Sequence, residues 1–125
     1  MKLDDCFRSI IETDPAPVVI ADLEHTIIYM NPASVRAYEA YGGERLLGGK
    51  LYGCHRPESN DKIDRVLEWF AESKEHNYVH TSFNAAKNKD VYMYAIRDQE
   101  GTLTGYYEKH EFRTKDDSPF YDMSY

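Results

Sequence analysis

Residues 17–34 read PVVIADLEHTIIYMNPAS and carry the pattern of a β-hairpin that leads into a helix. Two runs rich in β-branched residues, Val18–Asp22 and Thr26–Met30, flank the short segment Leu23-Glu24-His25. This spacing predicts two antiparallel strands joined by a tight turn. His25 lies where such turns often require a positive φ, which histidine tolerates better than most residues.

The chain after this hairpin is predicted to be helical. Asn31 is an N-cap residue directly before Pro32, so we expect a helix that runs to about Ala40 and ends at Gly42-Gly43. A longer helix is expected from Asp61 to Lys74, with Ser59 or Asn60 as its cap. Its apolar face is formed by Ile63, Val66, Leu67 and Phe70.

The two ends of the chain complete the predicted fold. Apolar residues recur at positions 3, 6, 7, 10 and 11, which indicates an amphipathic helix that ends at Asp14-Pro15-Ala16-Pro17. Three strands are expected at about 78–85, 91–98 and 103–112, with turns between them. Hairpins near both ends of the domain favour an antiparallel sheet, with the helices on one face. The sequence therefore predicts an α+β fold.

Composition narrows the range of functions. A chain of 125 residues fits one domain, and its net charge of −7 argues against binding to nucleic acid. No apolar run is long enough to cross a membrane, and the N-terminal segment lacks the apolar core of a signal peptide. We therefore expect a cytoplasmic protein with no membrane partner. The two cysteines form no disulfide framework, and a metal site would need other ligands at close spacing, so no metal site is predicted.

Four segments resemble the PAS domain, a sensory module, and they occur in that family's order. They are DPAPVVIAD at 14–22, TIIYMNPA at 26–33, GERLLG at 43–48 and IRDQEGTLTG at 96–105. Each match is short, but together they cover about residues 11–112. The chain is therefore identified as resembling a standalone, single-domain member of the PAS family.

The resemblance implies a fold, a function and a division of the chain. It implies a five-stranded antiparallel sheet with helices packed on one face, and sensory work in signal transduction rather than catalysis. Residues 1–13 would form an N-terminal helix, 14–113 the PAS domain, and 114–125 an acidic, loosely ordered tail. PAS domains frequently dimerise through a preceding helix, so a homodimer is expected. The candidate interface residues are Leu3, Phe7, Ile10 and Ile11.

The resemblance also implies a pocket between the sheet and the helices for a small molecule, while output would go through a signalling protein partner or the dimer. Period-2 alternation separates Tyr92, Tyr94 and Ile96 from Val91, Met93 and Ala95, and we expect the tyrosines to face inward. The alternative is that the same side chains fill the core, which would leave an interaction and dimerisation module. The candidate pocket residues are Val35, Tyr38, Leu47, Leu51, Ile63, Leu67, Phe70, Phe83, Tyr92, Tyr94 and Tyr106.

No cofactor is favoured by the sequence. Flavin photoreceptors of the family carry an asparagine before their reactive cysteine, whereas Gly53 precedes Cys54 here, so flavin is not expected. Haem needs an axial histidine or cysteine, and the candidates are His76, His80 and Cys54. A haem-based gas or redox sensor is therefore kept as an alternative function.

Cys54 and His55 could also be considered as a nucleophile and its base. Neighbouring side chains on an extended segment point to opposite faces, and nucleophile–base pairs usually meet from distant positions. The sequence therefore predicts no enzyme. Cys54 is expected to be a small buried residue, and His55-Arg56-Pro57 a turn.

Overall fold

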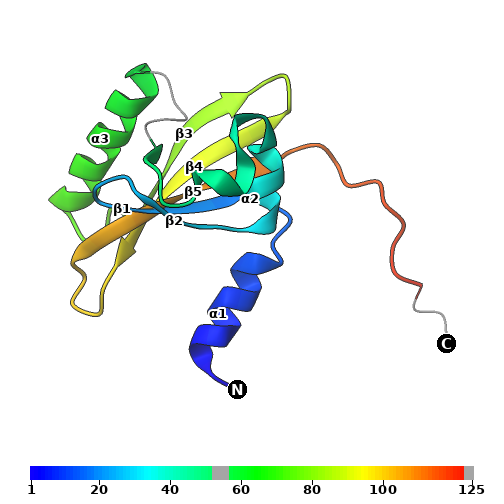
Figure 1. The fold of residues 1–125 in the computed structure, drawn as a ribbon, viewed down its shortest axis with the longest axis horizontal. Helices are drawn as coiled ribbons and strands as arrows, with labels where there is room; N and C mark the ends of the chain where they lie inside the picture. The colour runs from blue at the N-terminus through cyan, green and yellow to red at the C-terminus, as the bar shows by residue number, and fades with distance from the viewer. Residues whose placement is uncertain (52–56, 123–125) are drawn as a thin grey trace.

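The computed structural model describes residues 1–51 and 57–122, and its centre is a five-stranded antiparallel sheet (Figure 1). β5, the last strand of the chain, lies in the middle of the sheet, between β1 and β4. The predicted α+β, PAS-like fold is confirmed. The strands, in the order in which they lie in the sheet, are β2 (Ile27–Met30), β1 (Val18–Asp22), β5 (Leu103–Phe112), β4 (Lys89–Arg97) and β3 (Tyr78–Asn84).

The predicted hairpin between β1 and β2 is confirmed. His25 has a φ of 68°, and the Asp22 carboxylate accepts hydrogen bonds from the backbone N–H groups of Glu24 and Thr26. On the other side of β1, the backbone of β5 comes very close. A Cβ placed on Gly105 would lie 2.6 Å from the carbonyl oxygen of Ala21, so this pairing requires glycine.

Two helices differ from their expected bounds. α2 (Pro32–Ala37) is shorter than predicted and is followed by the 3-10 turns η1 (Glu39–Tyr41) and η2 (Gly43–Leu46). The Tyr38 carbonyl accepts from the N–H groups of Tyr41 and Gly43, which turns the chain back before Ala40 could extend the helix.

α3 (Pro57–Glu72) begins four residues earlier than predicted and ends two residues earlier. Proline is compatible with the first turn of a helix, because the N–H group that it lacks would have no partner there. Ser59 and Asn60 therefore lie inside the helix and do not cap it. The expectation that 55–57 form a turn is wrong for Pro57, while His55 and Arg56 lie outside the described residues.

The core lies between the sheet and α3, and it includes residues from both ends of the domain. α2 and α3 lie on one side of the sheet, which we call the inner face, while α1 (Leu3–Glu12) extends from the other side (Figure 1). None of the described helices is long and apolar enough to span a bilayer. Residues 114–122 form no helix or strand and are exposed. The buried cluster is made of Val19, Ala21, Ile27, Met30, Leu51, Ile63, Phe70, Met93 and Tyr106.

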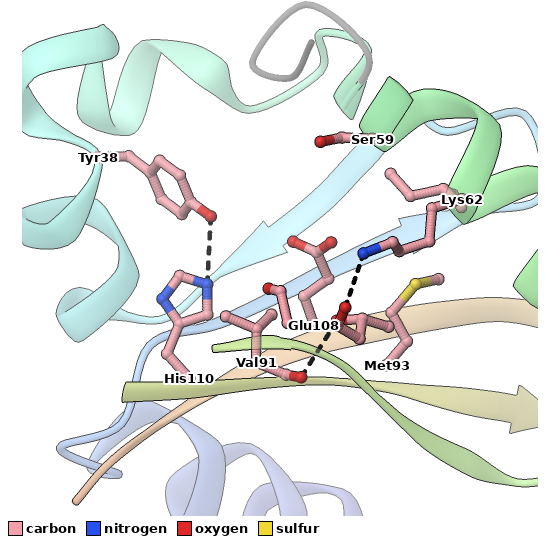
Figure 2. Close-up of a pocket in the computed structure, with 10 residues that line it drawn as sticks. Tyr38, Ser59, Lys62, Val91, Met93, Glu108 and His110 are labelled. Carbon is pink, nitrogen blue, oxygen red and sulfur yellow. Dashed lines mark hydrogen bonds between the residues drawn. The ribbon is translucent and has the colours of Figure 1, made fainter. Parts of the chain in front are cut away.

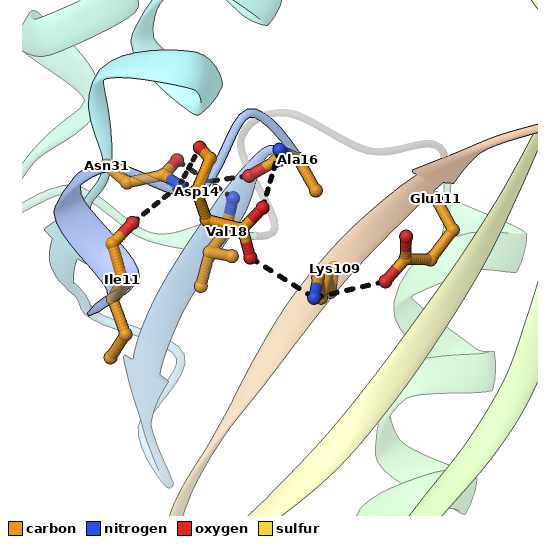
Figure 3. Close-up of polar contacts among 7 residues, drawn as sticks. All are labelled: Ile11, Asp14, Ala16, Val18, Asn31, Lys109 and Glu111. Carbon is orange, nitrogen blue, oxygen red and sulfur yellow. Dashed lines mark hydrogen bonds and ion pairs between the residues drawn. The ribbon is translucent and has the colours of Figure 1, made fainter. Parts of the chain in front are cut away.

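The fully buried side chain of Asn31 joins four parts of the chain (Figure 3). Its Oδ1 accepts from the backbone N–H of Ser34 at 2.9 Å, which caps α2, and from that of Val18 at 2.9 Å, where β1 begins. Its Nδ2 donates to the carbonyl of Ala16 at 2.9 Å and to that of Ile11 at 3.1 Å, in the last turn of α1.

Replacing this side chain should destabilise the protein strongly. In Asn31→Ala, buried backbone groups lose their partners and α2 loses its cap, so we expect the free energy of unfolding to fall by about 2–4 kcal/mol. Urea denaturation followed by circular dichroism measures this change. The side-chain Oδ1 of the exposed Asn84 accepts from the Lys87 N–H, and Asn84→Ala is the matched control, with an expected loss below about 1 kcal/mol. Equal losses in the two variants would contradict a joining role for Asn31.

Candidate functional site

A cavity of about 210 Å³ lies between α3 and the inner face of the sheet (Figure 2). Ile63, Val91 and Met93 form its apolar wall, and the other lining residues are polar or charged. Lys62 on α3 and Ser82 on β3 are exposed, so the cavity opens between these two elements. The polar lining consists of Tyr38, Ser59, Lys62, Thr81, Ser82, Glu108 and His110.

Three of the polar residues in and beside this cavity are buried. Glu108 and His110 are each 6% exposed, and Lys89, behind His110, is 9% exposed. The Nζ of Lys89 lies 3.0 Å from Nδ1 of His110, and the hydroxyl of Tyr38 lies 3.4 Å from its Nε2. A protonated lysine can only donate, so Nδ1 accepts and the hydrogen of the neutral imidazole lies on Nε2, toward Tyr38. Burial lowers the pKa of Lys89, as does the charge of Lys87, and the charge of Glu108 opposes both.

The mouth of the cavity is also polar. The Nζ of Lys62 donates to the carbonyl of Thr81 at 2.8 Å, and the hydroxyl of Thr81 donates to the carbonyl of Val91 at 3.1 Å. Ser59 lies one helical turn before Lys62, so the two residues share one face of α3. The arrangement offers a ligand a carboxylate, an ammonium group and several hydroxyls within one small space.

Most of the predicted pocket residues lie on the inner side of the sheet. Of these, Tyr38 and Ile63 line the cavity. The others fill the core, where Leu51, Phe70 and Tyr106 are buried and Val35 and Leu67 pack against them.

The expectation that the tyrosine face of β4 points inward is wrong. Met93 is buried, whereas Tyr92 and Tyr94 lie on the outer face, where Tyr94 stacks on Tyr107 with ring centroids 4.5 Å apart. Alternation alone could not choose between the faces, because both sets of β4 residues are apolar or aromatic. The outer face is covered instead by aromatic rings that stack on each other and on His80.

Two further pocket candidates lie outside the cavity. Phe83 is 53% exposed and pairs with Asp90 on the outer face, because a bulge between His80 and Ser82 shifts the register. Leu47 is 43% exposed and lines a separate groove beside β2, since η2 directs it toward this edge of the sheet.

Sequence reasoning missed Glu108 and His110. Tyr106 was expected to face inward, and period-2 alternation along β5 would have placed Glu108 and His110 on the same face. Charged residues are rarely buried, so composition directed attention to the tyrosines instead.

The residues described at the cavity do not fit haem. His76 stacks on Trp69 at the end of α3, and His80 pairs with Asp90 on the outer face, so neither reaches the cavity. The third candidate, Cys54, lies outside the described residues. His110 does line the cavity, but both of its ring nitrogens have polar neighbours, and a haem macrocycle exceeds the available volume. Among the described residues, no cluster of acidic, histidine or cysteine side chains could hold a metal ion.

The predicted dimer residues lie on an uncovered helix. Leu3, Phe7 and Ile10 of α1 are exposed, and Ile11 is half-buried. A hollow of about 210 Å³ separates the end of α1 from the outer face of the sheet. Its lining consists of Ile10, Ile11, Asp14, Val18, Ile20, Tyr107 and Lys109.

Comparisons with known proteins show the same fold. No family model and no curated protein matches this chain. Among solved structures, the C-terminal domain of a protein from Streptococcus mutans is 24% identical with a TM-score of 0.66, over 89% of this chain and 85% of that one. A PAS domain from Colwellia psychrerythraea is 16% identical with a TM-score of 0.67, over 92% and 100%.

A third similar structure comes from a receptor. The Aer2 receptor from Vibrio cholerae, described as a dual PAS-haem oxygen sensor, is 16% identical with a TM-score of 0.57, over 79% of this chain and 95% of that one. The chain described here therefore has the PAS fold.

Two lysines on opposite faces should titrate differently. Burial lowers the pKa of Lys89, whereas for Lys109 the effect of burial is outweighed by hydrogen bonds and charge from Glu111 and Asp14, which raise its pKa. A ¹³C NMR titration of the lysine Cε groups should show Lys89 losing its proton at lower pH than Lys109. The reverse order would contradict the described environment.

The same shift predicts how stability depends on pH. The unfolded chain keeps the Lys89 proton to a higher pH than the folded chain does, so it binds more protons between the folded pKa and the unfolded value of about 10.4. The contribution of Lys89 to the free energy of unfolding should therefore rise with pH across this window. Urea denaturation at several pH values should show a smaller rise in the free energy of unfolding for Lys89→Met than for the wild type. An identical pH dependence in both proteins would contradict the lowered pKa of Lys89.

Proposed function

We propose that this protein is a sensory module of signal transduction that binds a small molecule in the cavity between α3 and the sheet. The observation that carries the proposal is the buried polar group formed by Glu108, His110 and Lys89. Such groups are costly to bury, and an apolar core would be more stable. Ligand sites, in contrast, combine an apolar wall with a few placed polar groups, as this cavity does.

β5 offers a route from the cavity to the N-terminal helix. Glu108 and His110 point into the cavity, while Tyr107 and Lys109 alternate with them on the outer face. The Nζ of Lys109 lies 3.2 Å from the carboxylate of Asp14, at the base of α1 (Figure 3). A ligand that favours one position of β5 would therefore shift the population of α1 arrangements, and α1 would pass the signal to a partner.

A second candidate function is protein–protein interaction, including homodimerisation. It is supported by the exposed apolar stripe of α1 and by the aromatic outer face, where Tyr78, Tyr94 and Tyr107 stack in a row. Exposed apolar surface of this kind marks interaction sites in soluble proteins. The two candidates are compatible if ligand binding controls this surface.

The Aer2 receptor, which is described as a PAS-haem oxygen sensor and has the same fold, supports haem-based sensing. The placement of His76 and His80 away from the cavity argues against it here. We propose no catalytic role, because the sensory function of PAS domains requires binding and a conformational response but no reaction.

Native mass spectrometry should reveal the ligand. After incubation with a cell extract, the wild-type protein should carry an additional small mass. Ser82→Phe places a ring at the cavity mouth and should remove that mass, because the opening between α3 and β3 is then filled. Thr104→Phe, on an exposed part of β5, is the control and should retain it. Wild-type protein at bare chain mass would contradict the ligand-sensor proposal and favour a pure interaction module.

The homodimer can be tested on α1. Phe7 and Ile10 are 54% and 66% exposed, so the double variant Phe7→Asp, Ile10→Asp should stay folded. A dimer through α1 would have to bury the two new charges, which destabilises it. Light scattering after size exclusion should show a wild-type dimer and a monomeric variant. Leu23→Asp, at an exposed apolar residue of the β1–β2 turn, should remain dimeric. An unchanged mass for the double variant would exclude α1 as the interface.

A further inference from the structure

We propose that the ligand is a small zwitterionic amino acid, bound with its ammonium group at Glu108 and its carboxylate at Lys62 and Ser59. This inference rests on the proposed function of the cavity and names the chemical class that its lining would recognise.

The size of the cavity sets the first limit. A volume of about 210 Å³ holds about seven water molecules at ~30 Å³ each. It lies below the ~300–1,000 Å³ of pockets for drug-sized ligands. An amino acid of moderate size fits this space, whereas a flavin or a haem needs several times as much.

Glu108 supplies the site for the ammonium group. Its carboxylate rises from β5 into the middle of the cavity (Figure 2), and the residue is 6% exposed. An ionised carboxylate accepts hydrogen bonds and donates none, so the complementary ligand group is a cationic donor. Because the site is shielded from water, the attraction is stronger than it would be on the surface.

Lys62 and Ser59 supply the site for the carboxylate. An ammonium group can donate three hydrogen bonds, and the Nζ of Lys62 donates one of them to the carbonyl of Thr81. Ser59 stands one turn earlier on the same face of α3 and adds a hydroxyl donor. Both residues line the cavity on the side facing the sheet, opposite the strand that carries Glu108 (Figure 2).

The remaining wall suits an apolar side chain. Ile63, Val91 and Met93 line the cavity beside these polar groups, and Met93 is fully buried. An aliphatic amino acid would bury its side chain against them and remove that apolar surface from water. A simple carboxylic acid offers Glu108 no ammonium group, and a simple amine offers Lys62 no carboxylate.

Isothermal titration calorimetry with the standard L-amino acids tests this class. We expect the tightest binding from aliphatic ones. For L-valine, the deaminated analogue 3-methylbutanoate and the decarboxylated analogue isobutylamine should each bind at least about tenfold more weakly, because each lacks one charged contact. Equal affinity for either analogue would overturn the zwitterion assignment.

Matched variants locate the two contacts. Glu108→Gln should weaken L-valine at least about tenfold but leave 3-methylbutanoate unchanged. Glu100→Gln, the same substitution in the exposed turn before β5, should bind like the wild type. If Glu108→Gln does not fold by circular dichroism, Lys62→Met replaces it: this exposed position should lose affinity for L-valine but not for isobutylamine. Unchanged L-valine affinity in the folded variants would overturn the assignment.

Failure of this inference can be distinguished from failure of the proposed function. If no amino acid binds, yet the wild-type protein takes up another small mass from extract that Ser82→Phe does not, the ligand class is wrong and the sensor proposal stands. If no small mass binds at all, both are wrong.

Discussion

The side chain of Asn31 is the contact on which the remaining structure depends. The end of α1, the segment before β1, the first residue of β1 and the start of α2 all meet around this side chain. Asn31 supplies donors and acceptors to all four at once, and it is fully buried. Inside the protein these bonds are not exchanged with water, so they fix the angle at which α1 leaves the sheet.

The sheet separates two kinds of chemistry. The inner face carries the apolar core and, near the β3 edge, the polar cavity with Glu108 and His110. The outer face carries stacked tyrosines and the ion pairs of Lys109 and Arg113. Because β5 lies at the centre, it contributes to both faces, and successive residues of this one strand serve the cavity and the α1 hollow in turn.

The sequence predicted the elements well and the site only in part. The β1–β2 hairpin, the Asn31 cap and the three later strands follow from turn chemistry and residue pattern, which are local properties. The face of β4 that points inward could not be predicted in this way. Val91 and Met93 on one face and Tyr92 and Tyr94 on the other are all apolar or aromatic, so the tertiary contact with α3 decides which face is buried. Glu108 was missed for a related reason: it is buried in a cavity that Tyr38 after α2, α3 and three strands form together, which no local pattern encodes.

Signal transfer across such a sheet needs an element with two arrangements that both sites can bias. Lys109 satisfies part of this requirement, since it pairs with both Asp14 and Glu111 and could exchange one carboxylate for the other as β5 moves. Asp14 also accepts from the N–H of Ala16, and its carbonyl lies 3.4 Å from Nδ2 of Asn31. A displacement of β5 would thus reach the same few residues that hold the base of α1. The polar interior and the exposed helix are therefore two ends of one connected set of contacts. Under the proposed function, the stability lost in burying Glu108 and Lys89 would provide a site whose occupancy α1 would report.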